Sequence, residues 1–286
     1  MQYDVREPQA KNESELRSQL DSYREARRRF VTGPQGSLAL VNTEWITGSP
    51  AEGHTAYGVA GTWFALPKGE SGLRLEARAS DGIVVDGEPV DGSVVVRGRD
   101  DPRASAVQFS DTVSGFVIAS EDGDYALRVW DAASDAIAEF GSIDVYPFDP
   151  AWVVEATFAP IEGGRAIGIE HLKDGGVTRE RVVPAEITFS RDGVDYNLAA
   201  FHDDGGLLLV FSDATSGTDT YGVGRFLRVT ATTTGTVTLD FNRAYLPPCA
   251  FSYHFNCPMP PAQNRLAVAV EAGEKNVLNK AGGPLH

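Results

Sequence analysis

The chain has 286 residues, of which 42% are hydrophobic and 23% are charged. These proportions are typical of globular proteins, exclude a disordered chain, and fit one large domain or two moderate ones. Forty acidic residues outnumber 25 basic ones, so the formal charge is -15 and the isoelectric point is near 4.7. Because such an acidic protein repels phosphate backbones and anionic lipids, we expect neither nucleic acid nor a membrane surface as a partner.

The first residues carry no apolar core of a signal peptide. No later run reaches the roughly 18 apolar residues that a membrane span needs. We therefore expect a cytoplasmic protein. The predominance of arginine over lysine indicates a bacterial source.

Residues 1–35 are predicted to form an N-terminal helical segment. Between positions 12 and 30, apolar side chains recur every three or four residues, as on one face of a helix. Asn12 and Glu15 have the spacing of a capping box. The basic run Arg27–Arg29 falls in the last turn, where positive charge complements the helix dipole.

Residues 36–145 are predicted to form a β-sandwich. Short runs rich in Val, Ile and aromatic residues recur there, separated by Gly and Asp, which is typical of sandwiches and barrels. Asp86 and Gly87 lie between two such runs and indicate a tight hairpin. The alanine-rich segment 132–140 is predicted to form one or two helical turns.

Residues 146–286 are predicted to form a second, antiparallel β domain. Two prolines in the segment 146–150 interrupt regular structure, so we place the domain boundary there. The strand-like runs that follow are joined by glycine-containing turns, which favours a β-barrel or a second sandwich. The strands that begin at Arg225 and end near Asp240 are expected to pair as a hairpin. The whole chain is therefore predicted to be mainly β.

The segment 211–226 carries Asp213, Ser216, Tyr221 and Arg225 in and after a glycine-bearing loop. Hydroxyls and exposed amides in such a loop can hold an anion, although the spacing of a phosphate-binding loop is absent. The alternative is a hairpin loop whose Asp and Ser side chains cap their own backbone.

A loop without periodicity spans residues 240–265, which is long for a compact domain and typical of functional or self-packed loops. Its prolines reduce the entropy lost on ordering, and its aromatic residues can form a small core. Its amide and guanidinium groups can hold backbone carbonyls or bind a carboxylate or phosphate. These groups belong to Asn242, Arg243, Asn264 and Arg265.

Cys249 and Cys257 are the two cysteines of the chain, and four interpretations stay open. They could form a disulfide, which a reducing cytosol disfavours. They could join His254 in a zinc site, although three ligands are too few, and we predict no metal. Cys249 could be a nucleophile with His202 or His254 as its base. Finally, both thiols could be buried by packing alone.

The runs DATSGTDTYGVGRF, LDFNRAYLPPCAF, CPMPP and NRLAVAV together resemble the uncharacterised prokaryotic family called domain of unknown function 1684. The resemblance spans most of the chain and implies a pocket built from segments 211–226 and 240–265. It brings no known substrate or cofactor. It also implies that the N-terminal half is a forkhead-associated-like β-sandwich.

The chain departs from these relatives in two ways. Thr218 stands where family members often have lysine, so a lysine-based mechanism is not carried over. The N-terminal half lacks the Arg, Ser and Asn constellation with which forkhead-associated domains bind phosphothreonine, so that function is not carried over either.

We predict that the C-terminal domain binds a small anionic ligand. The alternatives are a hydrolase or transferase that uses Cys249 or Ser216, and a purely structural or interaction protein. Six of the candidate residues are expected to surround one concavity, namely Ser216, Tyr221, Arg225, Arg243, Tyr245 and Arg265. The full predicted ligand-binding set is Asp213, Ser216, Tyr221, Arg225, Asn242, Arg243, Tyr245, Cys249, Cys257, Asn264 and Arg265.

Overall fold

The computed structural model describes residues 13–203, 206–230 and 235–285. Within them the chain divides into two compact units, each described here by itself. The described part of unit 1 lies within residues 13–28, 141–250 and 256–284, and that of unit 2 comprises residues 29–140, 251–255 and 285. The units therefore divide the chain after residues 28 and 140, whereas the division based on sequence lies after residues 35 and 145. No helix in the described ranges is both long and apolar enough to span a bilayer.

Helix α1 (Glu13–Val31) forms where the apolar periodicity predicts it. Its apolar face buries Leu20, and Arg17 pairs with Glu13 one turn earlier. Asn12, the expected capping residue, lies outside the described residues. Arg27 lies near the end of α1, but its guanidinium also pairs with a carboxylate of unit 1, described below.

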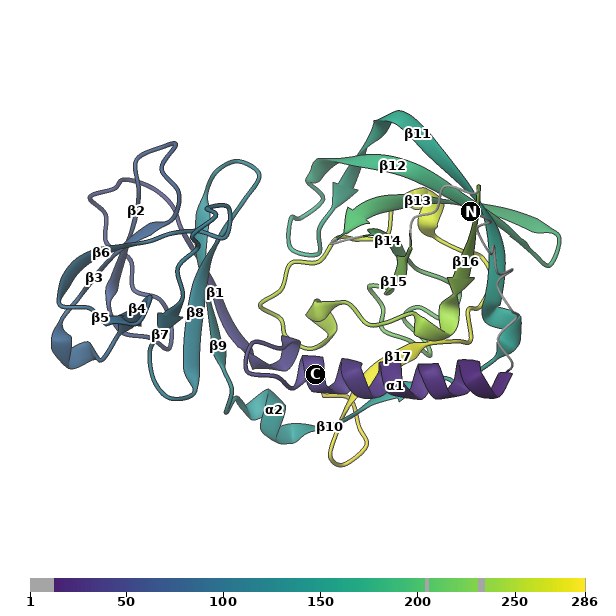
Figure 1. Cartoon of the computed structure of the whole chain (residues 1–286), viewed down its shortest axis with the longest axis horizontal. Helices are drawn as coiled ribbons and strands as arrows, with labels where there is room; N and C mark the ends of the chain where they lie inside the picture. The colour runs from purple at the N-terminus through teal and green to yellow at the C-terminus, as the bar shows by residue number, and fades with distance from the viewer. Residues whose placement is uncertain (1–12, 204–205, 231–234, 286) are drawn as a thin grey trace, which may run out of the picture. The chain divides into compact units, whose positions relative to one another are not determined.

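Unit 2 is a β-sandwich, as predicted. One sheet has six strands in the order β1-β9-β8-β7-β4-β5, and the other has three in the order β2-β3-β6 (Figure 1). The strands are β1 (Leu40–Ile46), β2 (Thr62–Ala65), β3 (Leu73–Ala77), β4 (Val84–Val85), β5 (Glu88–Pro89), β6 (Gly92–Val96), β7 (Val107–Gln108), β8 (Val113–Ala119) and β9 (Tyr125–Asp131). Short 3-10 turns are Ser37–Ala39 and Ala79–Asp81.

The core of unit 2 lies between these two sheets. Trp63, Leu75, Val117 and Leu127 are fully buried in it. The predicted tight hairpin is confirmed, because β4 and β5 pair around Asp86 and Gly87, both of which have positive φ angles. The predicted short helix is also present as α2 (Asp135–Glu139).

Unit 1 contains a six-stranded sheet in the order β15-β14-β13-β12-β11-β16, in which every neighbouring pair is antiparallel. The sheet curves into a half-barrel (Figure 1). Its strands are β11 (Val153–Glu170), β12 (Thr178–Arg191), β13 (Val194–Asp203), β14 (Gly206–Phe211), β15 (Arg225–Val229) and β16 (Thr236–Asp240). A second sheet pairs β10 (Phe140–Val145) with β17 (Glu274–Asn279). Short 3-10 turns are Pro150–Trp152, Phe241–Arg243, Pro248–Ala250 and Ala262–Asn264.

The predicted hairpin between β15 and β16 is wrong. The two strands stand at opposite ends of the strand order, and β16 pairs with β11 in a register that places Val153 opposite Asp240. This pairing directs Val237 and Leu239 into the core of unit 1, where both are buried. A register that buries one face of a strand outweighs proximity in the sequence, because a slip by one residue would expose that face.

Aromatic rings fill the centre of unit 1. The ring centroids of Trp152, Phe189 and Phe211 each lie 5.6 Å from that of Phe241, two of them at nearly perpendicular angles. Such edge-to-face contacts add to the stabilisation from apolar burial. Phe241 is the second residue of segment 240–265, so this packing anchors the start of the long loop.

Candidate functional site

Arg225 and Asp213 form a buried ion pair within unit 1. Both side chains are 0% exposed, and Nη2 of Arg225 lies 2.7 Å from Oδ2 of Asp213. Arg225 also donates to the carbonyls of Val270 and Ala272, and Asp213 accepts from the amide and hydroxyl of Thr215. The pair therefore ties the segment 211–226 to the chain that precedes β17.

Asn264 and Asn242 also hold the backbone of unit 1. The carboxamide of Asn264 accepts from the amide of Ala199 at 2.8 Å and donates to the carbonyls of Ala199 and Val210 at 2.9 and 2.8 Å. Asn242 makes the same two-way contact with the backbone of Asp149, at 2.9 Å each. Both amides are buried, so they fasten the two ends of the long loop.

Cys249 and Cys257 are free thiols, and both are buried. The amide of Cys249 donates to Sγ of Cys257 at 3.3 Å, and the Tyr221 hydroxyl donates to the Cys249 carbonyl at 3.1 Å. The hydrogen bond from Cys257 lowers the pKa of the Cys249 thiol. In the described part of the chain, no three His, Cys, Asp or Glu side chains gather as a metal site.

Ser216 and Arg265 contact the backbone as well. The Ser216 hydroxyl accepts from the amide of Asp213 at 3.1 Å, as the self-capped loop predicts. Arg265 is exposed, and its Nε donates to the carbonyl of Pro260 at 3.2 Å. The residues predicted from sequence to bind the ligand therefore fall into several separate hydrogen-bonded groups. Arg243 and Tyr245 belong to a different group, described next.

A cluster of arginine and tyrosine side chains forms in unit 1 and is called the Arg–Tyr cluster here. Helix α1 supplies two residues four positions apart, which lie on one face of a helix. Strand β15 supplies one arginine, the long loop supplies an arginine and a tyrosine, and β17 supplies a carboxylate. The members are Tyr23, Arg27, Arg228, Arg243, Tyr245 and Glu274.

Arg27 and Glu274 hold the centre of the Arg–Tyr cluster. Nε and Nη2 of Arg27 lie 2.9 and 3.1 Å from the two carboxylate oxygens of Glu274, a two-pronged arrangement. Glu274 also accepts from the amide of Leu246 at 2.8 Å. The guanidinium of Arg27 stacks on Tyr245, 4.7 Å from the ring centroid.

Two further guanidinium groups flank this centre. Arg228 lies 5.9 Å from the ring centroid of Tyr245, and Arg243 lies 5.5 Å from that of Tyr23. The Tyr23 hydroxyl donates to the carbonyl of Arg243 at 3.0 Å. The two tyrosine rings therefore connect the three arginines within one cluster.

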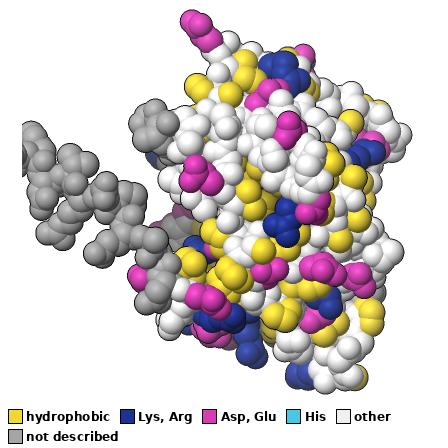
Figure 2. Space-filling model, turned by 90° about the vertical axis from the view of Figure 1, so that its right-hand side faces the viewer, with side chains coloured by type: hydrophobic (Ala, Val, Ile, Leu, Met, Phe, Trp, Pro, Cys, Tyr) yellow, Lys and Arg dark blue, Asp and Glu magenta, His cyan; other side chains and the backbone are white. Residues whose placement is uncertain are grey.

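Arg228 and Arg243 each use one nitrogen for an ion pair. Nε of Arg228 binds Asp203 at 2.6 Å, and Nε of Arg243 binds Asp240 at 3.2 Å. Among residues 13–203, 206–230 and 235–285, no acceptor binds the Nη atoms of either arginine. Their side chains are 68% and 38% exposed, so solvent reaches part of each side chain. The visible face in Figure 2 shows acidic and basic side chains interspersed.

Sequence reasoning found two members of the Arg–Tyr cluster, Arg243 and Tyr245, and missed the others. Arg27 was assigned to the helix dipole, although its spacing from Tyr23 places both on one helical face. Arg228 had a usable signal, because it is a charged residue within the apolar run 226–229. Glu274 had none, since only the tertiary structure brings it to α1.

Tyr23 and Tyr245 are expected to reduce stability at alkaline pH. Burial raises the pKa of both phenols above the ordinary value of 10.0. Above that value the unfolded chain loses phenolic protons that the folded protein keeps. The free energy of unfolding should therefore fall as pH rises past about 10, by up to about 1.4 kcal/mol per pH unit for each tyrosine. Below that pH the contribution is fully present.

Urea unfolding between pH 7 and 11.5 measures this fall. The variant with both Tyr23→Phe and Tyr245→Phe should show a shallower decline than the unsubstituted protein. Tyr57→Phe is the matched control, because Tyr57 is 82% exposed and its removal should leave the slope unchanged. Equal slopes for all three proteins would contradict the assignment.

Comparisons with known proteins bear on the same region. Residues 138–275 match the family model described as Protein of unknown function (DUF1684). The chain is also similar to an uncharacterized protein of Haloarcula marismortui, known from a solution NMR structure. The identity is 34%, the similarity covers 48% of this chain and 77% of that chain, and the TM-score is 0.40. Among curated proteins, none matches. Four members of the Arg–Tyr cluster thus lie within the residues that match this family of unknown function, namely Arg228, Arg243, Tyr245 and Glu274.

Proposed function

We propose that unit 1 binds a small anionic ligand, a carboxylate or a phosphate, at the Arg–Tyr cluster. The observation that carries this proposal is the open Nη pair on both Arg228 and Arg243. A guanidinium presents its Nη donors as a planar fork, which matches the two oxygens of a carboxylate or phosphate. The ion pairs with Asp203 and Asp240 leave these donors available.

The surroundings of the two arginines favour such a ligand. Exposed ion pairs contribute little stability, so an incoming anion displaces little when it approaches these groups. Arg27 is held in place by its ion pair with Glu274, and its guanidinium packs over the ring of Tyr245 and so helps to position it. Of the residues expected from sequence to bind the ligand, the proposal keeps Arg243 and Tyr245. Others, such as Arg225 and Asn264, hold the backbone around the cluster.

Thermal unfolding with inorganic phosphate or succinate, at constant ionic strength, tests the proposal. An anion at a hundred times its dissociation constant should stabilise the protein by about 2.7 kcal/mol. Arg228→Gln combined with Arg243→Gln should remove this effect. Arg165→Gln is the matched control, because Arg165 is also half-exposed and paired with a carboxylate on the same sheet, and it should retain the effect.

Two results would contradict the proposal. One is the absence of stabilisation of the unsubstituted protein by either anion. The other is an equal loss of stabilisation in the Arg165→Gln control, which would show that stabilisation by the anion depends on the net charge of the protein rather than on a specific site. The hydrolase or transferase alternative finds no support in the geometry. No hydrogen bond joins Cys249 or Ser216 to a histidine within the described residues, and Cys249 is buried.

A further inference from the structure

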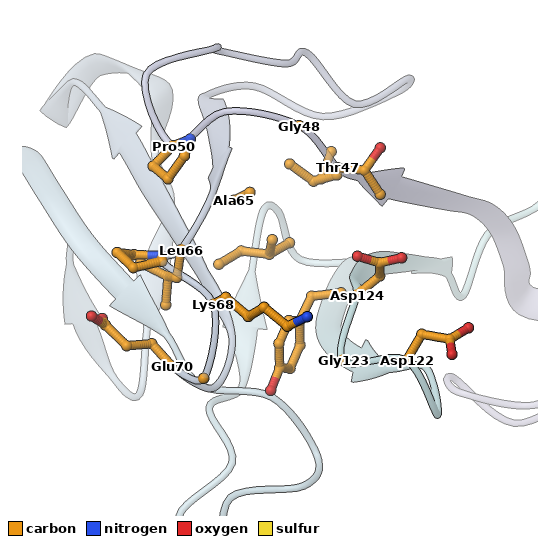
Figure 3. Close-up of a pocket in the computed structure, with 15 residues that line it drawn as sticks. Thr47, Gly48, Pro50, Ala65, Leu66, Lys68, Glu70, Asp122, Gly123 and Asp124 are labelled. Carbon is orange, nitrogen blue, oxygen red and sulfur yellow. The ribbon is translucent and has the colours of Figure 1, made fainter.

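A separate pocket of about 350 Å³ lies in unit 2, among three loops of the β-sandwich (Figure 3). The first loop follows β1, the second joins β2 to β3, and the third joins β8 to β9. Pro50, Leu66 and Pro67 give the pocket apolar surface that solvent reaches, whereas Ile46 and Leu73 in its lining are almost completely buried. Its volume is at the lower end of the range for small-molecule sites, about 300 to 1,000 Å³.

Charged groups of both signs line this pocket without pairing. Lys68 extends from the second loop toward the loop that carries Asp124 (Figure 3). Glu70 and Asp122 also belong to the lining. Within the described ranges, none of these four side chains forms an ion pair or a side-chain hydrogen bond. A lysine and an aspartate that line one pocket without contact leave room for a ligand between them.

Two features order the loops that carry the charged residues. The Tyr125 hydroxyl donates to Asp100 at 2.7 Å, and the Ser71 hydroxyl donates to the same carboxylate at 3.0 Å. Asp100 thus joins the loop that follows Lys68 to the start of β9. Gly69 and Gly123 have φ angles of 94° and 81°, which permit the tight turns beside Lys68 and Asp124.

The balance of charge narrows the class of ligand. One lysine against three carboxylates does not favour a phosphate or another pure anion, and it favours a ligand that brings an ammonium group. Lys68 favours a ligand that also brings a carboxylate, and no three acidic or histidine side chains in the described part of the chain gather as a metal site. A ligand that satisfies both Lys68 and Asp124 must therefore carry one charge of each sign.

We propose that this pocket binds a free α-amino acid with an aliphatic side chain. Its carboxylate pairs with Lys68, its ammonium pairs with Asp124, and its side chain contacts the accessible apolar lining that Pro50, Leu66 and Pro67 provide. All four charged residues are exposed, so Lys68 and Asp124 are accessible to such a ligand, whose charges each meet their opposite while its apolar part leaves water.

Isothermal titration calorimetry of the full chain with L-leucine tests this site. N-acetyl-L-leucine lacks the ammonium and L-leucinamide lacks the carboxylate, so each should bind at least tenfold more weakly than L-leucine. Inorganic phosphate, which under the proposed function binds the Arg–Tyr cluster, should leave the affinity for L-leucine unchanged. Absence of binding by any natural aliphatic amino acid at millimolar concentration would overturn the proposal.

Two variants test separately whether Lys68 binds the ligand carboxylate and whether Asp124 binds the ligand ammonium. In Lys68→Gln, L-leucine and L-leucinamide should bind equally weakly, because the partner of the carboxylate is gone. In Asp124→Asn, L-leucine and N-acetyl-L-leucine should become equal for the corresponding reason. A general structural defect would weaken all ligands without erasing these specific differences. Asp111→Asn is the matched control, since Asp111 is exposed in the same unit and outside the pocket. The proposal fails if Asp111→Asn changes the relative affinities as the two pocket variants do. It also fails if Lys68→Gln still binds L-leucine more tightly than L-leucinamide.

Discussion

Replacing Arg225 by methionine is expected to lower the free energy of unfolding by about 3 to 5 kcal/mol. The substitution removes one partner of a fully buried ion pair and leaves the Asp213 carboxylate charged without its counterion, which is costly in a low-dielectric interior. It also leaves the carbonyls of Val270 and Ala272 without their donor. Urea unfolding at pH 7, followed by far-ultraviolet circular dichroism, measures the change.

Two further variants separate the ion pair from its surroundings. Arg228→Met is the matched control on the same strand, and its loss should be below about 1 kcal/mol because its ion pair is exposed. Arg225→Met combined with Asp213→Asn should be less destabilising than the sum of the two single changes, because neither residue then leaves an uncompensated charge. If Arg225→Met costs no more than Arg228→Met, the pair does not hold the segment 211–226 in place.

Replacing Asn264 by alanine is expected to cost about 3 to 5 kcal/mol. One fully buried carboxamide satisfies the amide and carbonyl of Ala199 and the carbonyl of Val210. Alanine leaves these three backbone groups unpaired inside the core, and each unsatisfied buried group costs about 1 to 3 kcal/mol, with partial relaxation. The loop should then detach from β13 and β14 at lower urea concentration.

The adjacent Gln263 provides the control for this prediction. Its amide makes a longer contact of 3.3 Å to the carbonyl of Asn197 and is only half-buried. Gln263→Ala should therefore change the free energy of unfolding by about 0.5 kcal/mol or less. Comparable losses for both variants in urea unfolding would contradict an anchoring role of Asn264.

The sequence predicts those parts of the local structure that depend on neighbouring residues. The helix α1 follows from its apolar residues spaced three or four apart. The positive φ angles at Asp86 and Gly87 follow from turn chemistry. The strands of unit 2 follow from short runs rich in Val, Ile and aromatic residues. The resemblance to the DUF1684 family was likewise visible in short runs, and the family match agrees with it over residues 138–275, whereas the resemblance was expected to span most of the chain.

Longer-range choices were decided by the tertiary structure. Arg225 and Arg228 lie three residues apart on one strand, yet one is fully buried and the other mostly exposed. The pairing of β16 with β11, rather than with β15, depends on which register buries Val237 and Leu239. The sequence shows the chemical type of each residue. Whether that residue is buried depends on contacts with strands that are far away along the chain. That is why Arg225 became an anchor while Arg228 joined Tyr245 in the Arg–Tyr cluster.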